Sequence, residues 1–284
     1  MGCRLPMPLY TSGLLDGGAA SEKLLEGVLV ASALLAARLA VLVILLVLSY
    51  HDVRRREISY RQAAVLLAVA ALGAAVTHAW TAVPKGLPIA AYIVSNLILL
   101  AGTAAMALLG LLGWGDVVVL AAVFLSAPTT LGGLLPSLLV VIAYYVAALV
   151  VYMIINLLYN LITAREQLAK LPSWRLRIAY ALMARPRKAR DLAENPGWWY
   201  PLTLCGEYKL TFNLHMDPPD IVREVRKAIA KGCLKPDEVV WATYGVPAIP
   251  LLTAAYAAAL IIGDKPLLTL LPGLAAARGA TKWT

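Results

Sequence analysis

The fold class follows from residues 24–59, which read LLEGVLVASALLAARLAVLVILLVLSYHDVRRREIS. The first part of this stretch, 24–50, is an apolar run, and Asp52 and three consecutive arginines follow it. About 18 consecutive apolar residues are enough for an α-helix to cross the hydrocarbon core of a bilayer. We therefore predict that residues 24–50 form a membrane-spanning helix that ends at a charged membrane surface.

The rest of the chain repeats this pattern. Of its 284 residues, 61% are hydrophobic and only 14% are charged, whereas about a quarter of the residues are charged in a typical soluble domain. Further apolar runs occupy about 62–83, 87–112, 116–135, 136–162 and 246–262. These runs are continuous rather than alternating, which argues against a membrane β-barrel. The sequence therefore predicts an all-α integral membrane protein with six transmembrane helices.

One charged side chain, Arg38, falls well inside the first run. A long helix can tilt or protrude from the bilayer, and a long basic side chain can then extend to the outer headgroups. We favour this arrangement for Arg38. The alternative is a buried arginine that pairs with a carboxylate, but Asp52 lies about 21 Å further along the helix.

Lysine and arginine are distributed unevenly between the two ends of these helices. The connection 51–61 and the polar segment 164–240 together hold 18 of the 25 basic residues. Because basic connections stay in the cytoplasm, we expect both segments there, and the net charge of +9 requires no nucleic-acid partner. The predicted organisation is an N-terminal extension (1–23), five transmembrane helices that carry the motifs (24–163), a cytoplasmic domain (164–240), and a sixth transmembrane helix with a C-terminal tail (241–284).

The polar segment 164–240 predicts a small α+β domain between the fifth and sixth helices. Residues 164–193 have the composition of basic helices broken by two prolines. Residues 198–214 alternate between apolar and polar side chains and are rich in aromatic residues, as short strands are. An amphipathic helix is expected over 219–229.

The three cysteines, Cys3, Cys205 and Cys233, are isolated in the sequence. No two of them have the Cys-x-x-Cys spacing that is typical of zinc sites. We therefore expect neither a structural zinc site nor a disulfide framework.

Two aspartates lie where an apolar run meets a polar break. Asp52 follows the first run, and Asp116 closes Gly113-Trp114-Gly115-Asp116 at the start of the fourth. A carboxylate beside hydrocarbon is costly and is rarely kept without a use. Six spans in the predicted orientation bring both aspartates to the cytoplasmic face. Two carboxyl groups that share one proton can act as general base and general acid in peptide hydrolysis.

The residues around the second aspartate fit such a site. Gly113 and Gly115 would let an extended substrate approach the backbone closely, and Trp114 would anchor the loop at the membrane interface. Simpler interpretations stay open for each aspartate alone. Asp52 could be an ordinary interfacial charge at a helix end, and Asp116 could be the N-cap of the fourth helix.

The arginine run Arg54, Arg55 and Arg56 is most simply a determinant of topology. These side chains could also contact anionic lipid or the substrate.

The motifs taken together resemble a known family. Asp52 is followed after five residues by Ile58-Ser59, and Gly113-x-Gly115-Asp116 comes next in the chain. The stretch 240–250, VWATYGVPAIP, leads into the last span. In order and spacing these features are similar to the archaeal preflagellin and prepilin peptidases, a group of Gly-x-Gly-Asp membrane aspartyl proteases. The similarity covers roughly 35–263.

This resemblance implies six helices and cleavage of class III signal peptides from preflagellins and prepilins at the cytoplasmic face of the plasma membrane. Asp52 and Asp116 would be the catalytic pair. The implied partners are the precursor proteins and the lipid bilayer, with a homo-oligomer left open, and no metal or organic cofactor is implied. Bacterial prepilin peptidases differ in carrying a lysine where this chain has Val118, and in a cysteine-rich methylating domain. We therefore expect no N-methyltransferase activity.

Two other functions stay open. A small ion- or proton-coupled membrane transporter could use the same intramembrane carboxylates, although both are expected at one face rather than at the midplane. A non-enzymatic assembly factor for a pilus machine would keep its role without either aspartate.

Overall fold

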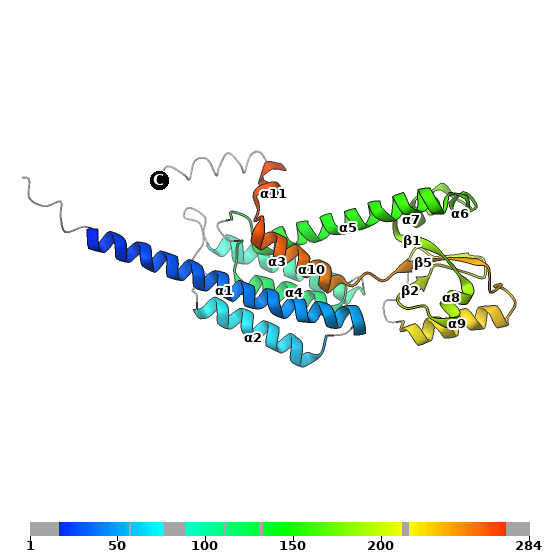
Figure 1. Ribbon diagram of the computed structural model, residues 1–284, viewed down its shortest axis with the longest axis horizontal. Coiled ribbons are helices and arrows are strands. Elements are labelled where there is room, and N and C mark those ends of the chain that lie inside the picture. The colour runs from blue at the N-terminus through cyan, green and yellow to red at the C-terminus, as the bar shows by residue number, and fades with distance from the viewer. Residues whose placement is uncertain are drawn as a thin grey trace, which may run out of the picture.

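The computed structural model describes residues 17–56, 58–76, 89–110, 112–130, 133–211 and 216–270. Figure 1 shows a bundle of long helices that continues at one end into a small region of strands and short helices. The main helices of the bundle are α1 (Gly17–Arg55), α2 (Tyr60–Val76), α3 (Ile89–Leu108), α4 (Trp114–Ser126), α5 (Ser137–Thr163) and α10 (Ala248–Ile261). A short helix, α11 (Lys265–Leu270), follows α10. The N-terminal extension and the end of the C-terminal tail lie largely outside the described residues.

Three helices are long and apolar enough to cross a bilayer, and they span Val28–Arg55, Ile89–Leu108 and Ser137–Thr163. The helices α2, α4 and α10 are apolar but shorter. The outward surfaces of the long helices carry large apolar side chains, among them Leu46 on α1 and Ile98 on α3, which are 56% and 66% exposed. Such surfaces suit hydrocarbon rather than water. The chain is therefore a membrane protein that is mostly helical.

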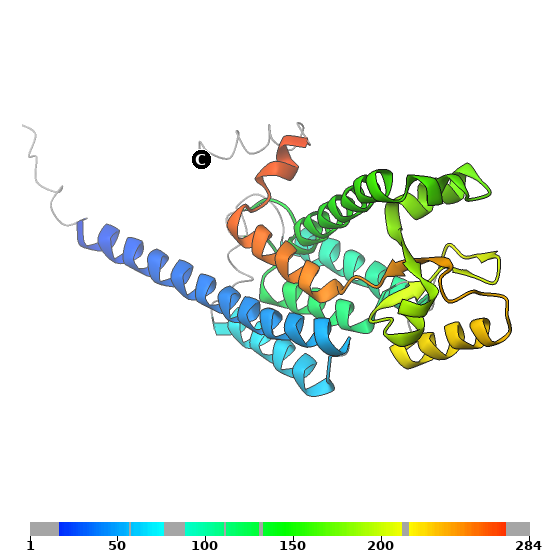
Figure 2. The same ribbon diagram turned by 45° about the vertical axis from the view of Figure 1, so that its right-hand side comes forward.

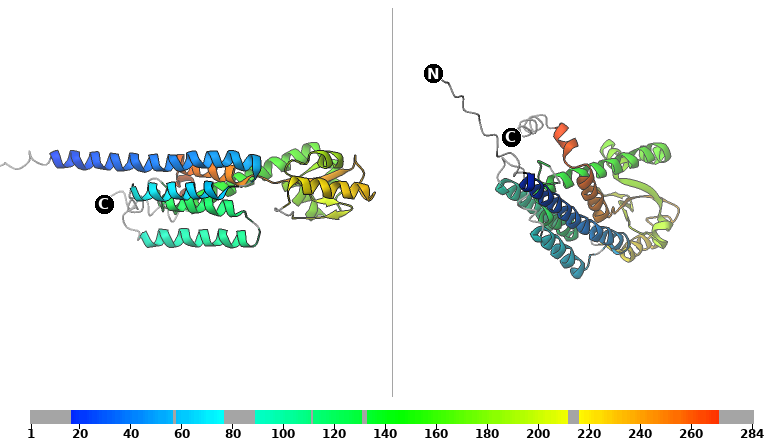
Figure 3. Two further views of the ribbon diagram at one scale, coloured as in Figure 1. Left: turned by 90° about the horizontal axis from the view of Figure 1, so that it is seen from below. Right: turned by 60° about the vertical axis from the view of Figure 1, so that its left-hand side comes forward.

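The core of the bundle forms around α4, which contacts α1, α2, α3, α5 and α10. Figure 3 shows α1, α2 and α3 running side by side with it. On α1 the fully buried side chains Val41, Leu45 and Leu48 recur at helical spacing, so one stripe of this helix faces the core. A Cβ atom at Gly73 would lie 3.0 Å from the Cβ atom of Ala37, so glycine allows α2 to approach α1 closely.

The fourth predicted span is shorter than expected. The sequence predicts a helix over 116–135, but α4 ends at Ser126. Pro128 lacks the backbone N–H that a continuing helix would need, and it disfavours helical backbone at the residue before it. The chain then turns back, because Ser137 donates its amide to the carbonyl of Pro128 at 3.0 Å. The connection between α4 and α5 therefore lies within the bundle.

The prediction that Arg38 reaches the outer headgroups is wrong. Its side chain is only 3% exposed, and Nη2 donates to the carbonyl oxygen of Thr129 at 3.0 Å. On the same connection between α4 and α5, the buried carboxylate of Asp264 accepts the amides of Leu134 and Leu135 at 2.6 and 3.0 Å. Because the described residues of the α4–α5 connection are mostly buried, their backbone groups need partners. Arg38 and Asp264 supply partners for three of these groups.

The second part of the chain is the α/β region, residues 164–211 and 216–244. It holds α6 (Arg165–Ala169), α7 (Trp174–Met183), β1 (Ala184–Lys188), α8 (Ala189–Glu194), β2 (Trp199–Pro201), β3 (Thr203–Leu204), β4 (Glu207–Tyr208), α9 (Pro218–Ala230) and β5 (Val239–Tyr244). The main sheet is antiparallel in the order β1-β5-β2, and β3 and β4 form a separate hairpin. The amphipathic helix predicted over 219–229 is confirmed as α9, which buries Ile221, Val225 and Ala228.

Two features of the α/β region differ from the sequence prediction. Residues 184–188, expected to be helical, form the edge strand β1, in which Pro186 lies opposite Trp241; an edge strand tolerates a proline because one of its sides needs no ladder bonds. In addition, β5 (Val239–Tyr244) crosses the boundary predicted between residues 240 and 241, and it ends before the predicted last span at about 246.

The expectation of no disulfide is also wrong, because Cys205 and Cys233 are bonded to each other. Cys205 and Gly206 form the two-residue turn between β3 and β4, and both have positive φ values, 50° and 82°, as a type I′ hairpin requires. This turn carries Cys205 to the segment after α9, where Cys233 lies. A sequence separation of 28 residues gave no indication of the pairing.

Polar contacts join the α/β region to the end of α5. Nδ2 of Asn160 donates to the carbonyl oxygens of Ala181 and Ala184 at 3.0 and 2.6 Å. Nε of Arg185 donates to Oδ1 of Asn156 at 2.8 Å. Both asparagines are buried. The region is therefore attached to the bundle through side-chain contacts as well as through the chain itself.

Candidate active site

Asp52 lies in the last turn of α1 and is only 8% exposed. Its Oδ2 accepts the backbone amide of Ile249 at 3.3 Å. Ile249 is in the first turn of α10, where helix amides have no partner within their own helix. One turn deeper, the hydroxyl oxygens of Ser49 and Thr253 are 2.8 Å apart and align α1 with α10. The Asp52 carboxylate is thus held at the start of α10.

Asp116 lies in the first turn of α4 and is 9% exposed. Its Oδ2 accepts the backbone amide of Gly113 at 3.1 Å. The N-cap residue of α4 is Gly113 rather than Asp116, so Asp116 occupies the third helical position. A carboxylate there bonds back to the N-cap amide, as in one half of a capping box. This contact orients the carboxylate and uses one of its oxygens.

The two carboxyl groups come close enough to interact electrostatically, although they are 64 positions apart in the sequence. Gly115 helps to bring them together. A Cβ atom there would lie 3.2 Å from Cδ1 of Ile58 and 3.8 Å from Cδ1 of Ile249. Ile249 therefore contacts the Asp52 carboxylate through its amide and faces the turn of Asp116 through its side chain.

The other residues of the Gly-x-Gly-Asp motif are less constrained. A Cβ atom at Gly113 would make only ordinary contact, 3.4 Å from Oδ2 of Asp116. The role expected for Gly113, close approach of a substrate, therefore stays a prediction. Trp114 is 57% exposed at the start of α4, and its role as an interfacial anchor also stays a prediction.

The three arginines after Asp52 have different surroundings in the structure. Arg54 and Arg55 are exposed, and the guanidinium of Arg54 lies over the ring of Tyr50 on its own helix. Arg56 is partly buried. Its guanidinium carbon lies 4.9 Å and 5.5 Å from the ring centroids of Trp198 and Tyr244 in the α/β region. Figure 2 shows α1 ending beside this region.

Sequence reasoning missed two neighbours of the carboxyl groups. Ile249 acts through its backbone amide, and only its place in the stretch 240–250 pointed towards it. Tyr145 of α5 is partly buried and interacts electrostatically with Asp116; an aromatic residue inside a long apolar run carries no local indication of such a role. Within the described residues, no group of three or more His, Cys, Asp or Glu side chains is arranged to hold a metal ion.

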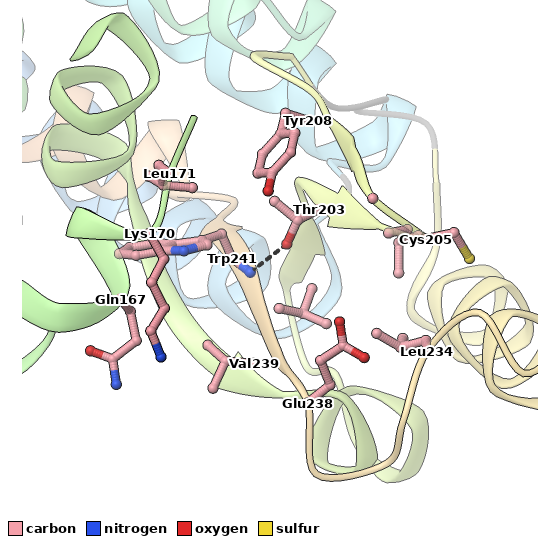
Figure 4. Close-up of a pocket in the computed structure, with 13 residues that line it drawn as sticks. Gln167, Lys170, Leu171, Thr203, Cys205, Tyr208, Leu234, Glu238, Val239 and Trp241 are labelled. Atoms are coloured by element: carbon pink, nitrogen blue, oxygen red, sulfur yellow. Dashed lines mark hydrogen bonds between the residues drawn. The ribbon is translucent and has the colours of Figure 1, made fainter. Parts of the chain in front are cut away.

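A cavity of about 340 Å³ lies in the α/β region, and its lining includes none of the residues discussed above as the site. Figure 4 shows Lys170 and Glu238 at its rim and Trp241 across it, with the Trp241 amide hydrogen-bonded to Oγ1 of Thr203. This cavity does not reach the two aspartates, so it is separate from the candidate site.

Comparison with known proteins supports the resemblance drawn from the motifs. Residues 176–265 match the family model described as Archaeal Peptidase A24 C-terminus Type II. This match runs from α7 into α11 and includes Ile249, but not the two aspartates. Among the curated proteins there is no match. The family match to residues 176–265 agrees with the resemblance to archaeal prepilin and preflagellin peptidases that the motifs indicate.

Proposed function

We propose that this protein is a membrane aspartyl endopeptidase that cleaves class III signal peptides from preflagellins and prepilins at the cytoplasmic membrane face. The observation that carries the proposal is the pair of buried, electrostatically interacting carboxyl groups of Asp52 and Asp116, which two separate helices supply. The family of the α/β region makes peptide hydrolysis the reaction that fits this pair best.

The chemistry requires the two carboxyl groups to differ in protonation. The ionised one takes a proton from water as the water attacks the scissile carbonyl, and the neutral one hydrogen-bonds or protonates the carbonyl oxygen. Two like charges this near each other disfavour double ionisation, so the pair retains one proton over a range of pH. Each carboxylate also accepts one backbone amide, which fixes its orientation.

The proposed topology has six spans, with α2, α4 and α10 crossing alongside the three longer helices. The basic α/β region and the arginines after Asp52 then lie in the cytoplasm. In this orientation both aspartates are at the cytoplasmic end, because α1 finishes there and α4 begins there. The hydrophobic helix of the precursor would lie among the bundle helices, and its basic leader would lie beside the α/β region.

The test is cleavage of a preflagellin or a prepilin in membranes that contain the wild-type protein, Asp52→Asn or Asp116→Asn. Asp237→Asn is the matched control, because its side chain is exposed in the α/β region. We expect cleavage by the wild type and the control, and a loss of at least about a thousandfold in both site variants. Cleavage that survives either site substitution would remove that residue from the chemistry.

A wild-type protein that cleaves no precursor would contradict the proposal. Proton- or ion-coupled flux in vesicles, abolished by the same two substitutions, would then favour the transporter alternative.

A further inference from the structure

Arg56 differs from its neighbours in both backbone and side chain. Its φ is 57°, a left-handed conformation that costs free energy for a residue with a Cβ atom. Its amide still donates to the carbonyl of Asp52 at 3.0 Å, so the turn follows directly on the last helical bond of α1. Such a conformation persists only where surrounding contacts hold it.

The contacts that hold Arg56 come from the α/β region. Its guanidinium lies over Trp198 and Tyr244, an arrangement that attracts a cation to the ring faces. The two aromatic residues are fixed relative to each other, because the amide of Gly245 donates to the carbonyl of Trp198 at 2.9 Å. Gly245 itself has no room for a side chain, since a Cβ atom would lie 2.7 Å from the Tyr200 ring. Arg56 therefore contacts an edge of the sheet, formed by Trp198, Tyr244 and Gly245, in which the residues are held in fixed positions.

This edge is connected to Asp52 by two routes. The first is Arg56 itself, one helical turn from Asp52 and near enough for its positive charge to act on the carboxylate. The second is the chain from Tyr244 through Gly245 to Ile249, whose amide binds the same carboxylate. Both routes begin at Tyr244, so a displacement of the α/β region would disturb both contacts of Asp52.

We propose that Arg56 is a positioning residue that couples the docking of the α/β region to the place of the Asp52 carboxylate in the active pair. The effect on cleavage rests on the proposed function, whereas the structural coupling between the α/β region and Asp52 does not depend on it. A nearby positive charge favours the ionised form of a carboxyl group. Arg56 therefore favours the ionised form of Asp52, which is the form that a general base requires.

Arg55 provides a matched control. It is adjacent in the sequence and carries the same charge, but it is exposed, and it makes no ring contact or ion pair among the described residues. The variants are Arg56→Met, Arg56→Lys and Arg55→Met. Methionine removes the charge, whereas lysine keeps the charge and changes the stacking.

The first measurement does not depend on activity. Hydrogen exchange of the peptide that contains Ile249 reports whether its amide remains bound to Asp52. We expect exchange about tenfold faster in Arg56→Met than in the wild type, and unchanged exchange in Arg55→Met. Equal exchange in the wild type and Arg56→Met would overturn the structural coupling, even if the wild type cleaves precursors normally.

The second measurement is the pH dependence of cleavage. The charged or polar groups that act on the pair are Arg56 and the Ile249 amide at Asp52, and Tyr145 and the Gly113 amide at Asp116. Without the Arg56 charge, the ionised form of Asp52 loses a stabilising interaction, so the acidic limb of the profile should move to higher pH in Arg56→Met. Arg56→Lys should return the limb to the wild-type position. A limb that stays in place in Arg56→Met would overturn the catalytic role.

Discussion

Charged side chains are buried at both ends of the helical bundle, and the two ends use them differently. At the end that holds the α4–α5 connection, Arg38 donates to one backbone carbonyl and Asp264 accepts two backbone amides. At the other end, Asp52 and Asp116 each accept one amide and face each other's charge. Burial of a charge alone therefore does not identify a functional group. The distinction is that Arg38 and Asp264 bind backbone groups of the α4–α5 connection, whereas Asp116 also interacts with the charge of Asp52.

The largest effect on stability is expected at the first of these ends. In Asp264→Ala the amides of Leu134 and Leu135 would lose their acceptor inside the bundle, at a cost of about 2–5 kcal/mol in the free energy of unfolding. Asp52→Asn and Asp116→Asn should unfold close to the wild-type temperature, because an asparagine oxygen can still accept one amide. Thermal unfolding in detergent micelles measures this contrast. An Asp264→Ala protein as stable as the wild type would show that the Asp264 carboxylate does not stabilise the α4–α5 connection.

A smaller effect is expected from the packing between α1 and α4. Gly115→Val would press against Ile58 and Ile249, at a cost of about 1–3 kcal/mol in stability, and should lower cleavage by displacing Asp116. Gly113→Ala meets no close contact and should leave stability unchanged. Thermal unfolding and cleavage rates of both variants check this prediction. Gly115→Val with wild-type stability and rate would contradict the packing role of this glycine.

The Gly113→Ala variant also separates a role of this glycine in the fold from a role in substrate approach. If it loses cleavage while its unfolding temperature stays constant, the glycine serves the approach of the substrate rather than the fold. Normal cleavage would leave Gly113 without that role.

Features that depend on local patterns could be predicted from the sequence. The helical runs, the amphipathic α9 and the placement of Asp52 and Asp116 at one end follow from hydropathy and from the order of the spans. Features set by distant partners could not. Arg38 binds a carbonyl 91 residues away, and Cys205 pairs with Cys233 across 28 residues. The strand β1 forms around Pro186 because β5 lies beside it.

The candidate site shows the same division. The two aspartates and the glycines of the motif are visible as sequence patterns, whereas Ile249 contributes only a backbone amide, which every residue except proline possesses. The arginines look equivalent in the sequence. Only the fold of the α/β region places aromatic rings against Arg56 and leaves Arg55 exposed.

The proposed peptidase mechanism requires Asp52 and Asp116 to act as one unit, and a double variant can show whether they do. Cleavage rates would be measured for Asp52→Asn, Asp116→Asn and the two combined. When two residues act in the same chemical step, substituting the second after the first lowers the rate little further. We therefore expect the double variant to be as slow as either single variant, within a few-fold. Losses that multiply, so that the double variant is slower by the product of the two single effects, would contradict a shared catalytic pair.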